Sequence, residues 1–237
     1  MADAEALPRM ADSVEQHTLN GRFSAIIFDM DGVIVDSEPL HVRAFLDIFR
    51  EMGMENSHGI DFEAYLGKSD RTLWVDFVEM HRPKQTLEEL QEWKQKHTIN
   101  LLRHERPIFP EIPALVARLA ETHPLAVASG SRHAVIDTVL KFEGLRPHFD
   151  VVVSVQDVER TKPAPDIFLR AAELLQVDPS EICVIEDSAA GVEAALSAGM
   201  QVIAITNSLG AEELQNATCV VNSYEEIGGL LPGAVEA

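Results

Sequence analysis

Two aspartates, Asp29 and Asp31, lie two positions apart after a short apolar run, and Gly32 follows the second of them. A pair of carboxylates on one turn can bind a cation or exchange protons, and glycine permits the turn because it adopts backbone angles that larger residues resist. A simple turn built on aspartate side chains is the alternative for so short a motif. An EF-hand calcium loop is disfavoured, because a strand precedes the pair and Leu40 stands where such a loop has its glutamate.

A second acidic pair, Glu186 and Asp187, follows another apolar run and precedes an alanine-rich helix that contains Gly191. Ligands of open parallel sheets bind beyond the carboxyl ends of the strands, so both acidic pairs are expected to face one crevice. Clustered carboxylates favour a hard cation, and Mg²⁺ is the ion that we expect. For Gly191 we expect a structural role, the close packing of its helix against the sheet.

Two further segments are suited to a phosphate group. Ser129 and Gly130 open a small turn after a predicted strand, where a hydroxyl group and free backbone N–H groups suit an anion. Capping of the next helix is an equally good explanation for Ser131. Lys162 precedes Pro163, which favours an extended backbone and so presents the lysine, although a solvent-exposed lysine is the alternative when Lys162 is considered alone.

Short apolar runs typical of buried strands alternate with helical patterns along the chain. The expected strands are Phe23–Phe28, Leu125–Ala128, Val151–Val155, Ile182–Ile185 and Val202–Ile205, and the expected helices between them are Pro113–Ala120, His133–Phe142, Asp166–Leu175 and Ala189–Ala198. This alternation predicts an α/β fold, a Rossmann-like parallel sheet covered by helices on both faces.

The first two strands are separated by about eighty residues without a strand pattern, too many for one crossover, which predicts an inserted all-helical cap domain. Phe45, Ile48 and Phe49 recur at helical spacing in its first helix, and Ser69–Met80 and Thr86–Leu102 supply further helices. We therefore expect a flexible leader at 1–20, a catalytic core formed by 21–36 and 111–237, and the cap at 37–110.

The composition is that of a globular protein, with 46% hydrophobic and 24% charged residues in a chain of 237. A formal net charge of −20 opposes the binding of nucleic acid. No run approaches the ~18 apolar residues of a membrane helix and the start of the chain lacks a signal-peptide pattern, so we expect a cytoplasmic protein without a membrane partner, a monomer or a weak dimer. Cys183 and Cys219 lie in separate apolar runs and are expected to be reduced.

The chemical motifs occur in one order along the chain. They are Phe28-Asp29-Met30-Asp31-Gly32-Val33, Ser129, Lys162-Pro163-Ala164-Pro165-Asp166, and Glu186-Asp187-Ser188 followed by Gly191 and Ala198-Gly199-Met200. In this order, and from about Phe23 to Pro232, the chain resembles the haloacid dehalogenase superfamily, specifically its β-phosphoglucomutase-like branch with a helical cap after the first strand. Ordered motifs at suitable spacing are far more specific than any one of them.

The resemblance implies a small phosphorylated substrate and phosphoryl transfer to Asp29, which attacks phosphorus. Asp31 would protonate the departing alkoxide and later deprotonate the attacking water. Ser129 and Gly130 would bind the phosphoryl oxygens, and Lys162 would pair with both Asp29 and the phosphoryl group.

The resemblance also implies a ligand set for Mg²⁺. The ion would be held by the side chains of Asp29 and Asp187, by the carbonyl of Asp31 and by Glu186. It would offset the repulsion between the nucleophile and the phosphate.

The cap is expected to decide the substrate, and it carries most of the exposed-looking cations, Lys94 among them. Its residues expected to face the substrate are His41, Lys68, Arg71 and Lys96. His41 and Lys96 match cap positions that contact substrate or assist acid/base chemistry in the mutases. The arginine that holds the second phosphate in the mutases is shifted by one place here, to Arg71, and Asp70 stands in its place.

We therefore expect the hydrolysis of a sugar or polyol phosphate. A β-phosphoglucomutase-type phosphosugar mutase is the alternative, and a catalytically silent regulator that binds a phosphometabolite ranks third. Dehalogenation is disfavoured, because Asp31 and the expected magnesium ligands suit phosphoryl transfer better.

Overall fold

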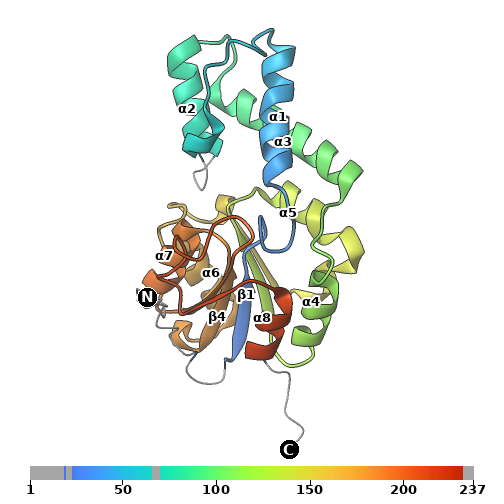
Figure 1. Cartoon of the computed structure of the whole chain (residues 1–237), viewed down its shortest axis with the longest axis vertical. Helices are drawn as coiled ribbons and strands as arrows, with labels where there is room; N and C mark the ends of the chain where they lie inside the picture. Colours follow the sequence, from blue (N-terminus) through green and yellow to red (C-terminus); the bar gives the residue numbers. More distant parts are fainter. Residues whose placement is uncertain (1–18, 20–22, 66–69, 232–237) are drawn as a thin grey trace, which may run out of the picture.

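The computed structural model describes residues 19, 23–65 and 70–231 (Figure 1). Within these ranges the strands form one sheet in the order β3-β2-β1-β4-β5-β6, and every neighbouring pair is parallel. The strands are β1 (Ala25–Phe28), β2 (Leu125–Ser129), β3 (Val151–Ser154), β4 (Ile182–Glu186), β5 (Gln201–Ile205) and β6 (Cys219–Val221). The predicted α/β fold is confirmed, and the strand order reverses between β1 and β4, where open sheets bind their ligands.

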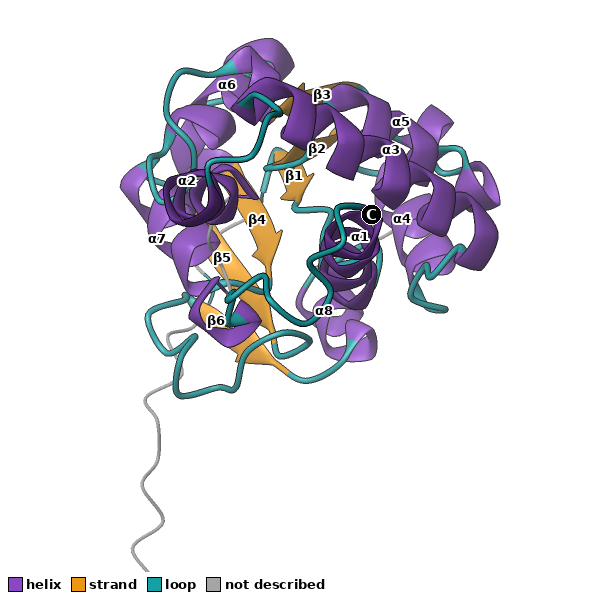
Figure 2. Cartoon of the chain, turned by 90° about the horizontal axis from the view of Figure 1, so that it is seen from above, coloured by secondary structure: helices purple, strands orange, loops and turns teal. Residues whose placement is uncertain are grey.

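Helices cover both faces of the sheet because the side chains of β1 alternate between two buried layers (Figure 2). Ile26 and Phe28 belong to one layer and Ala25 and Ile27 to the other. The first layer is completed by α4 (Ile112–Ala120), α5 (His133–Leu140) and α8 (Tyr224–Leu230), and the second by α6 (Asp166–Leu175) and α7 (Ala189–Ser197). Burial on both faces explains why these strands are continuous apolar runs.

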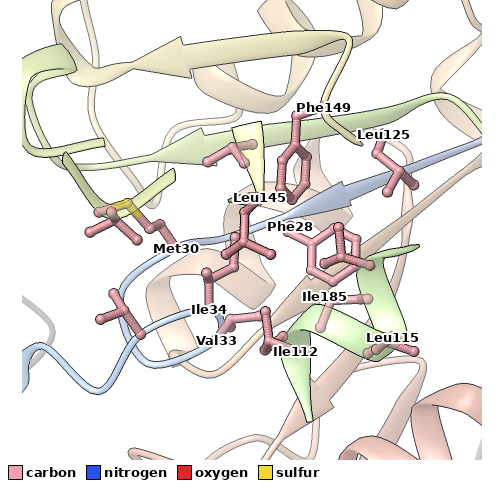
Figure 3. Packing of buried hydrophobic residues seen from close by; sticks show 14 of the residues in the cluster. Phe28, Met30, Val33, Ile34, Ile112, Leu115, Leu125, Leu145, Phe149 and Ile185 are labelled. Carbon is pink, nitrogen blue, oxygen red and sulfur yellow. The ribbon is translucent and has the colours of Figure 1, made fainter. Parts of the chain in front are cut away.

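The turn after β1 is anchored in the first layer by apolar side chains (Figure 3). Met30, Val33 and Ile34 are fully buried there beside Phe28. The N–H groups of Val33 and Ile34 both donate to the carbonyl of Met30, at 3.3 and 2.8 Å. The acidic residues of this turn are thus carried by a backbone that is packed into the core.

A group of helices stands above the carboxyl end of the sheet (Figure 1). These are α1 (Glu38–Glu51), α2 (Asp70–His81) and α3 (Leu87–Glu105), which follow β1 in the chain and precede α4 and β2. They enclose a buried cluster of their own, formed by Phe45, Ile48, Phe49, Ile60, Leu73, Trp74, Phe77 and Leu90. The all-helical insertion is therefore confirmed, while the expected domain boundaries stay predictions.

Both cysteines are free, with Cys183 buried and Cys219 half-buried. Among the described residues, no helix has the length and apolar character needed to cross a bilayer.

Candidate active site

The two acidic pairs meet because β1 and β4 are neighbouring strands. Phe28 pairs with Ile185, and the N–H of Asp29 donates to the carbonyl of Ile185 at 2.9 Å. Asp29, Glu186 and Asp187 are all buried, and each offers a carboxylate oxygen that lies within 4.8 Å of the others. The topology of the sheet, not proximity in the chain, assembles this cluster.

Lys162 lies against the carboxylates. Its Nζ is 2.5 Å from Oδ1 of Asp29 and 2.6 Å from Oε1 of Glu186, and it lies over the ring of Phe168 at 4.9 Å from the centroid. The side chain of Lys162 is only 14% exposed. The alternative of a solvent-exposed lysine is therefore wrong.

The acidic cluster carries more negative charge than Lys162 can compensate. Burial raises the pKa of Asp29 to about 8, because the opposing effect of Lys162 is offset by the neighbouring carboxylates of Glu186 and Asp31. Burial, Glu186 and Asp29 also raise the pKa of Asp187 well above its usual value. Among the described residues, three buried carboxylates face the ammonium group of Lys162, so two of their negative charges are uncompensated within this group when all four side chains are ionised.

This donor set fits Mg²⁺. All ligand atoms are hard carboxylate oxygens, and a divalent cation would compensate the two remaining charges. Asp29, Glu186 and Asp187 are the residues that would hold it.

The side chain of Asp31 lies apart from that cluster, among hydroxyl groups. Its carboxylate accepts hydrogen bonds from Oγ of Ser37 at 2.6 Å, of Ser131 at 2.9 Å and of Ser129 at 3.2 Å, and Nε2 of His41 lies 3.3 Å away. Burial opposes ionisation, but His41 and the serine hydroxyls hold the pKa of Asp31 well below its usual range. These donors therefore favour the base form of Asp31.

The end of β2 and the turn that follows it supply two of these hydroxyls. Ser129 is fully buried, and its Oγ accepts the N–H of Ser131 at 3.0 Å, while Gly130 is exposed between them. The alternative that Ser131 caps α5 is wrong: Arg132 occupies the N-cap position without a capping side chain, and the Ser131 hydroxyl donates to Asp31 instead.

Gly191 lets α7 approach the end of β4 closely, as expected. A Cβ atom at this position would lie 1.6 Å from Oε1 of Glu186, the last residue of β4, so glycine also makes room for the carboxylate. The other oxygen of Glu186 accepts the N–H groups of Asp187 at 2.8 Å and of Ser188 at 2.9 Å. The glycine and these N–H groups hold Glu186 in one orientation.

A chain of contacts joins Asp31 to the cap. Nζ of Lys94, on α3, lies 2.5 Å from Oδ2 of Asp70, at the start of α2, and also donates to Nδ1 of His41, on α1. An ammonium group can only donate, so Nδ1 of His41 accepts and its Nε2 carries the proton that points to Asp31. His41 is thus a donor to the carboxylate through Nε2.

The structure corrects the expected positions of the cap cations. Lys94, expected to be exposed, is buried with 4% of its side chain accessible, whereas Lys96 is exposed on the opposite side of α3. The burial of Lys94 could have been predicted from the sequence, because Lys94 shares helical spacing with the other residues of the buried face of α3, which are Leu90, Thr98 and Leu102. Arg71 is exposed on α2, and Lys68 lies outside the described residues.

The chain matches the model of the haloacid dehalogenase-like hydrolase family over residues 26–205. It is 31% identical over 185 residues to the fructose-1-phosphate phosphatase YqaB of Escherichia coli, covering 77% of this chain and 96% of that protein. It is 34% identical over 196 residues to hexitol phosphatase B of the same bacterium, covering 81% and 86%.

A solved structure of β-phosphoglucomutase from Clostridium difficile superposes with a TM-score of 0.74 at 25% identity, covering 88% of this chain and 97% of that one. The family match spans most of the sequence, including the buried acidic cluster at the β1–β4 junction. The chain therefore belongs to the haloacid dehalogenase-like hydrolases.

Proposed function

We propose that this protein is a magnesium-dependent phosphatase that hydrolyses a small sugar or polyol phosphate through an aspartyl-phosphate on Asp29. The observation that carries the proposal is the buried group of Asp29, Glu186 and Asp187 around the Lys162 ammonium. The named activities of the Escherichia coli relatives, on fructose 1-phosphate and hexitol phosphates, support the substrate class.

In the first step Oδ of Asp29 attacks phosphorus and the alkoxide of the sugar leaves. Lys162 lies where it can pair with the nucleophile and with the incoming phosphoryl oxygens, which lowers the repulsion between two anions. Bound Mg²⁺ would supply further charge neutralisation at the same place. The exposed turn at Gly130 and the buried hydroxyl of Ser129 are suited to the phosphoryl oxygens.

Asp31 serves as acid and then as base. It must carry a proton to release the alkoxide, so the donors around its carboxylate must rearrange as substrate enters. The contacts in the structure, in which the Asp31 carboxylate accepts from Ser37, Ser131 and His41, suit the second step, in which Asp31 takes a proton from the water that attacks the aspartyl-phosphate.

Asp70 favours a phosphatase over a mutase. In the described part of the cap, Lys94 is a buried cation that reaches Asp31 through His41, and its charge is already compensated by Asp70. Desolvation opposes ionisation of Asp70, but the ammonium group of Lys94 keeps the pKa of Asp70 below its usual value. A second phosphate, which a mutase must hold during reorientation, would therefore meet a carboxylate at this position.

The second candidate is a phosphosugar mutase, favoured by the similarity to the β-phosphoglucomutase structure. Purified protein with Mg²⁺ would be tested on a panel of sugar and polyol phosphates, with phosphate release and isomer formation measured together. We expect release of phosphate from several monophosphates. Interconversion of hexose 1- and 6-phosphates without release would establish the mutase, and binding without turnover would establish a regulator.

A further inference from the structure

Asn207 and Ser208, which follow β5, contact both acidic motifs although neither of them is acidic. Oγ of Ser208 donates a hydrogen bond to Oδ2 of Asp187. Nδ2 of Asn207 donates to the carbonyl of Gly32 at 2.8 Å. Neighbouring residues of one loop thus hold the turn that follows Asp31 and a carboxylate of the acidic cluster.

Gly32 shows how closely these loops approach. Its backbone has a φ of +80°, and a Cβ atom would lie 1.8 Å from Oδ2 of Asp187 and 2.7 Å from Oγ of Ser208. The turn of the first acidic motif therefore packs directly on the hydrogen-bonded pair. Asp187 is confined between Gly32 and Ser208, which leaves its carboxylate little freedom to rotate.

Tyr224 fixes the same loop from the other side. Its hydroxyl donates to the carbonyl of Val33 at 2.6 Å and accepts from Nδ2 of Asn207 at 2.8 Å. Tyr224 begins α8 and is 7% exposed, so its position is set by the core. Asn207 is in this way tied to a rigid element, and Ser208 follows it directly.

We propose that Ser208 is a positioning residue of the catalytic centre. Its hydroxyl donates to Oδ2 of Asp187 and so orients the carboxylate toward the cation. Asn207 and Tyr224 hold Ser208 in place. A free carboxylate can rotate or bind a cation in several ways, whereas a hydrogen bond to one oxygen selects a single orientation. Such partners of metal ligands affect metal affinity without touching the metal. The proposal rests on the proposed function, because it assumes that Asp187 is a cation ligand.

The test is direct binding of Mn²⁺ to the full-length chain, measured by titration calorimetry without substrate, for wild type, Ser208→Ala and Ser208→Thr. We expect Ser208→Ala to weaken Mn²⁺ binding about 10-fold. Ser208→Thr keeps the hydroxyl and should bind close to wild type. Ser57→Ala, a change at an exposed serine of the cap, is the matched control and should bind like wild type.

Ser208 is exposed, so thermal unfolding of the metal-free Ser208→Ala protein should match wild type, which separates positioning from loss of fold. Equal Mn²⁺ affinity of Ser208→Ala and wild type would overturn the role of Ser208 and leave the phosphatase proposal standing. A wild-type chain that binds no Mn²⁺ would instead overturn the metal site itself.

Discussion

The ammonium group of Lys162 lies 2.5 Å from Oδ1 of Asp29, although 133 residues separate the two in the chain. The lysine comes from the loop before α6 and the aspartate from the end of β1. The contact places a fixed positive charge beside the proposed nucleophile, inside a site that is otherwise acidic. Its loss would leave the carboxylates of Asp29 and Glu186 without the ammonium group that faces them.

Replacing Lys162 by methionine should destabilise the metal-free protein by about 3 kcal/mol, because breaking a buried ion pair leaves uncompensated charge. Chemical denaturation at pH 8 in EDTA measures this, and added Mg²⁺ should recover part of the loss. Lys84→Met, at an exposed lysine between α2 and α3, is the control and should change little. Equal stability of the two variants would show that the charge of Lys162 does not stabilise the carboxylate cluster.

Asp29→Asn should reduce turnover of every phosphate ester by roughly 1,000-fold or more, since an amide cannot attack phosphorus. It should also abolish labelling of the protein by acid-quenched radioactive substrate. Asp137→Asn, at an exposed aspartate on α5, is the matched change and should leave turnover intact. Turnover by Asp29→Asn near the wild-type rate would exclude an aspartyl-phosphate at this residue.

Lys94→Met and Lys96→Met form a matched pair on one helix. Lys94→Met removes the buried partner of both Asp70 and His41, so we expect a stability loss of about 1–2 kcal/mol and a marked fall in kcat/KM for sugar phosphates. Lys96→Met changes an exposed side chain and should stay within about 0.5 kcal/mol of wild type, with unchanged kinetics. The reverse ranking would mean that α3 is rotated relative to the structure.

Gly191→Ala should destabilise the protein by about 2 kcal/mol and weaken Mg²⁺ binding, because the new methyl group occupies the space of the Glu186 carboxylate. Gly229→Ala provides the control within α8. A Cβ there meets nothing within 4 Å, so alanine should stabilise its helix by up to about 1 kcal/mol. Thermal unfolding and a Mg²⁺ titration of both variants measure these effects. A Gly191→Ala protein as stable as wild type would contradict a clash between the new methyl group and the Glu186 carboxylate.

The sheet could be predicted from the sequence because its signals are local. Ala25–Phe28 and Ile182–Glu186 are continuous apolar runs, which marks strands buried on both faces, and the helical patterns between strands require parallel connections. The acidic pairs follow such runs directly, so their place at the edge of the sheet followed from the fold class alone. The clustering of both acidic pairs at one edge of the sheet could therefore be predicted without knowledge of any tertiary contact.

Other features depended on which surfaces meet in three dimensions. Lys94 and Lys96 are of the same residue type two positions apart, and only the packing of α3 against α1 and α2 decides that Lys94 reaches His41 while Lys96 meets solvent. Ser131 donates to Asp31, and Ser208 to Asp187, across distances in the chain that no local pattern encodes. The sequence by itself determined the strands, the order of the motifs and the family. Only the tertiary structure decided which hydroxyl and ammonium groups face the carboxylates, because hydrogen bonds between loops depend on the relative placement of whole elements.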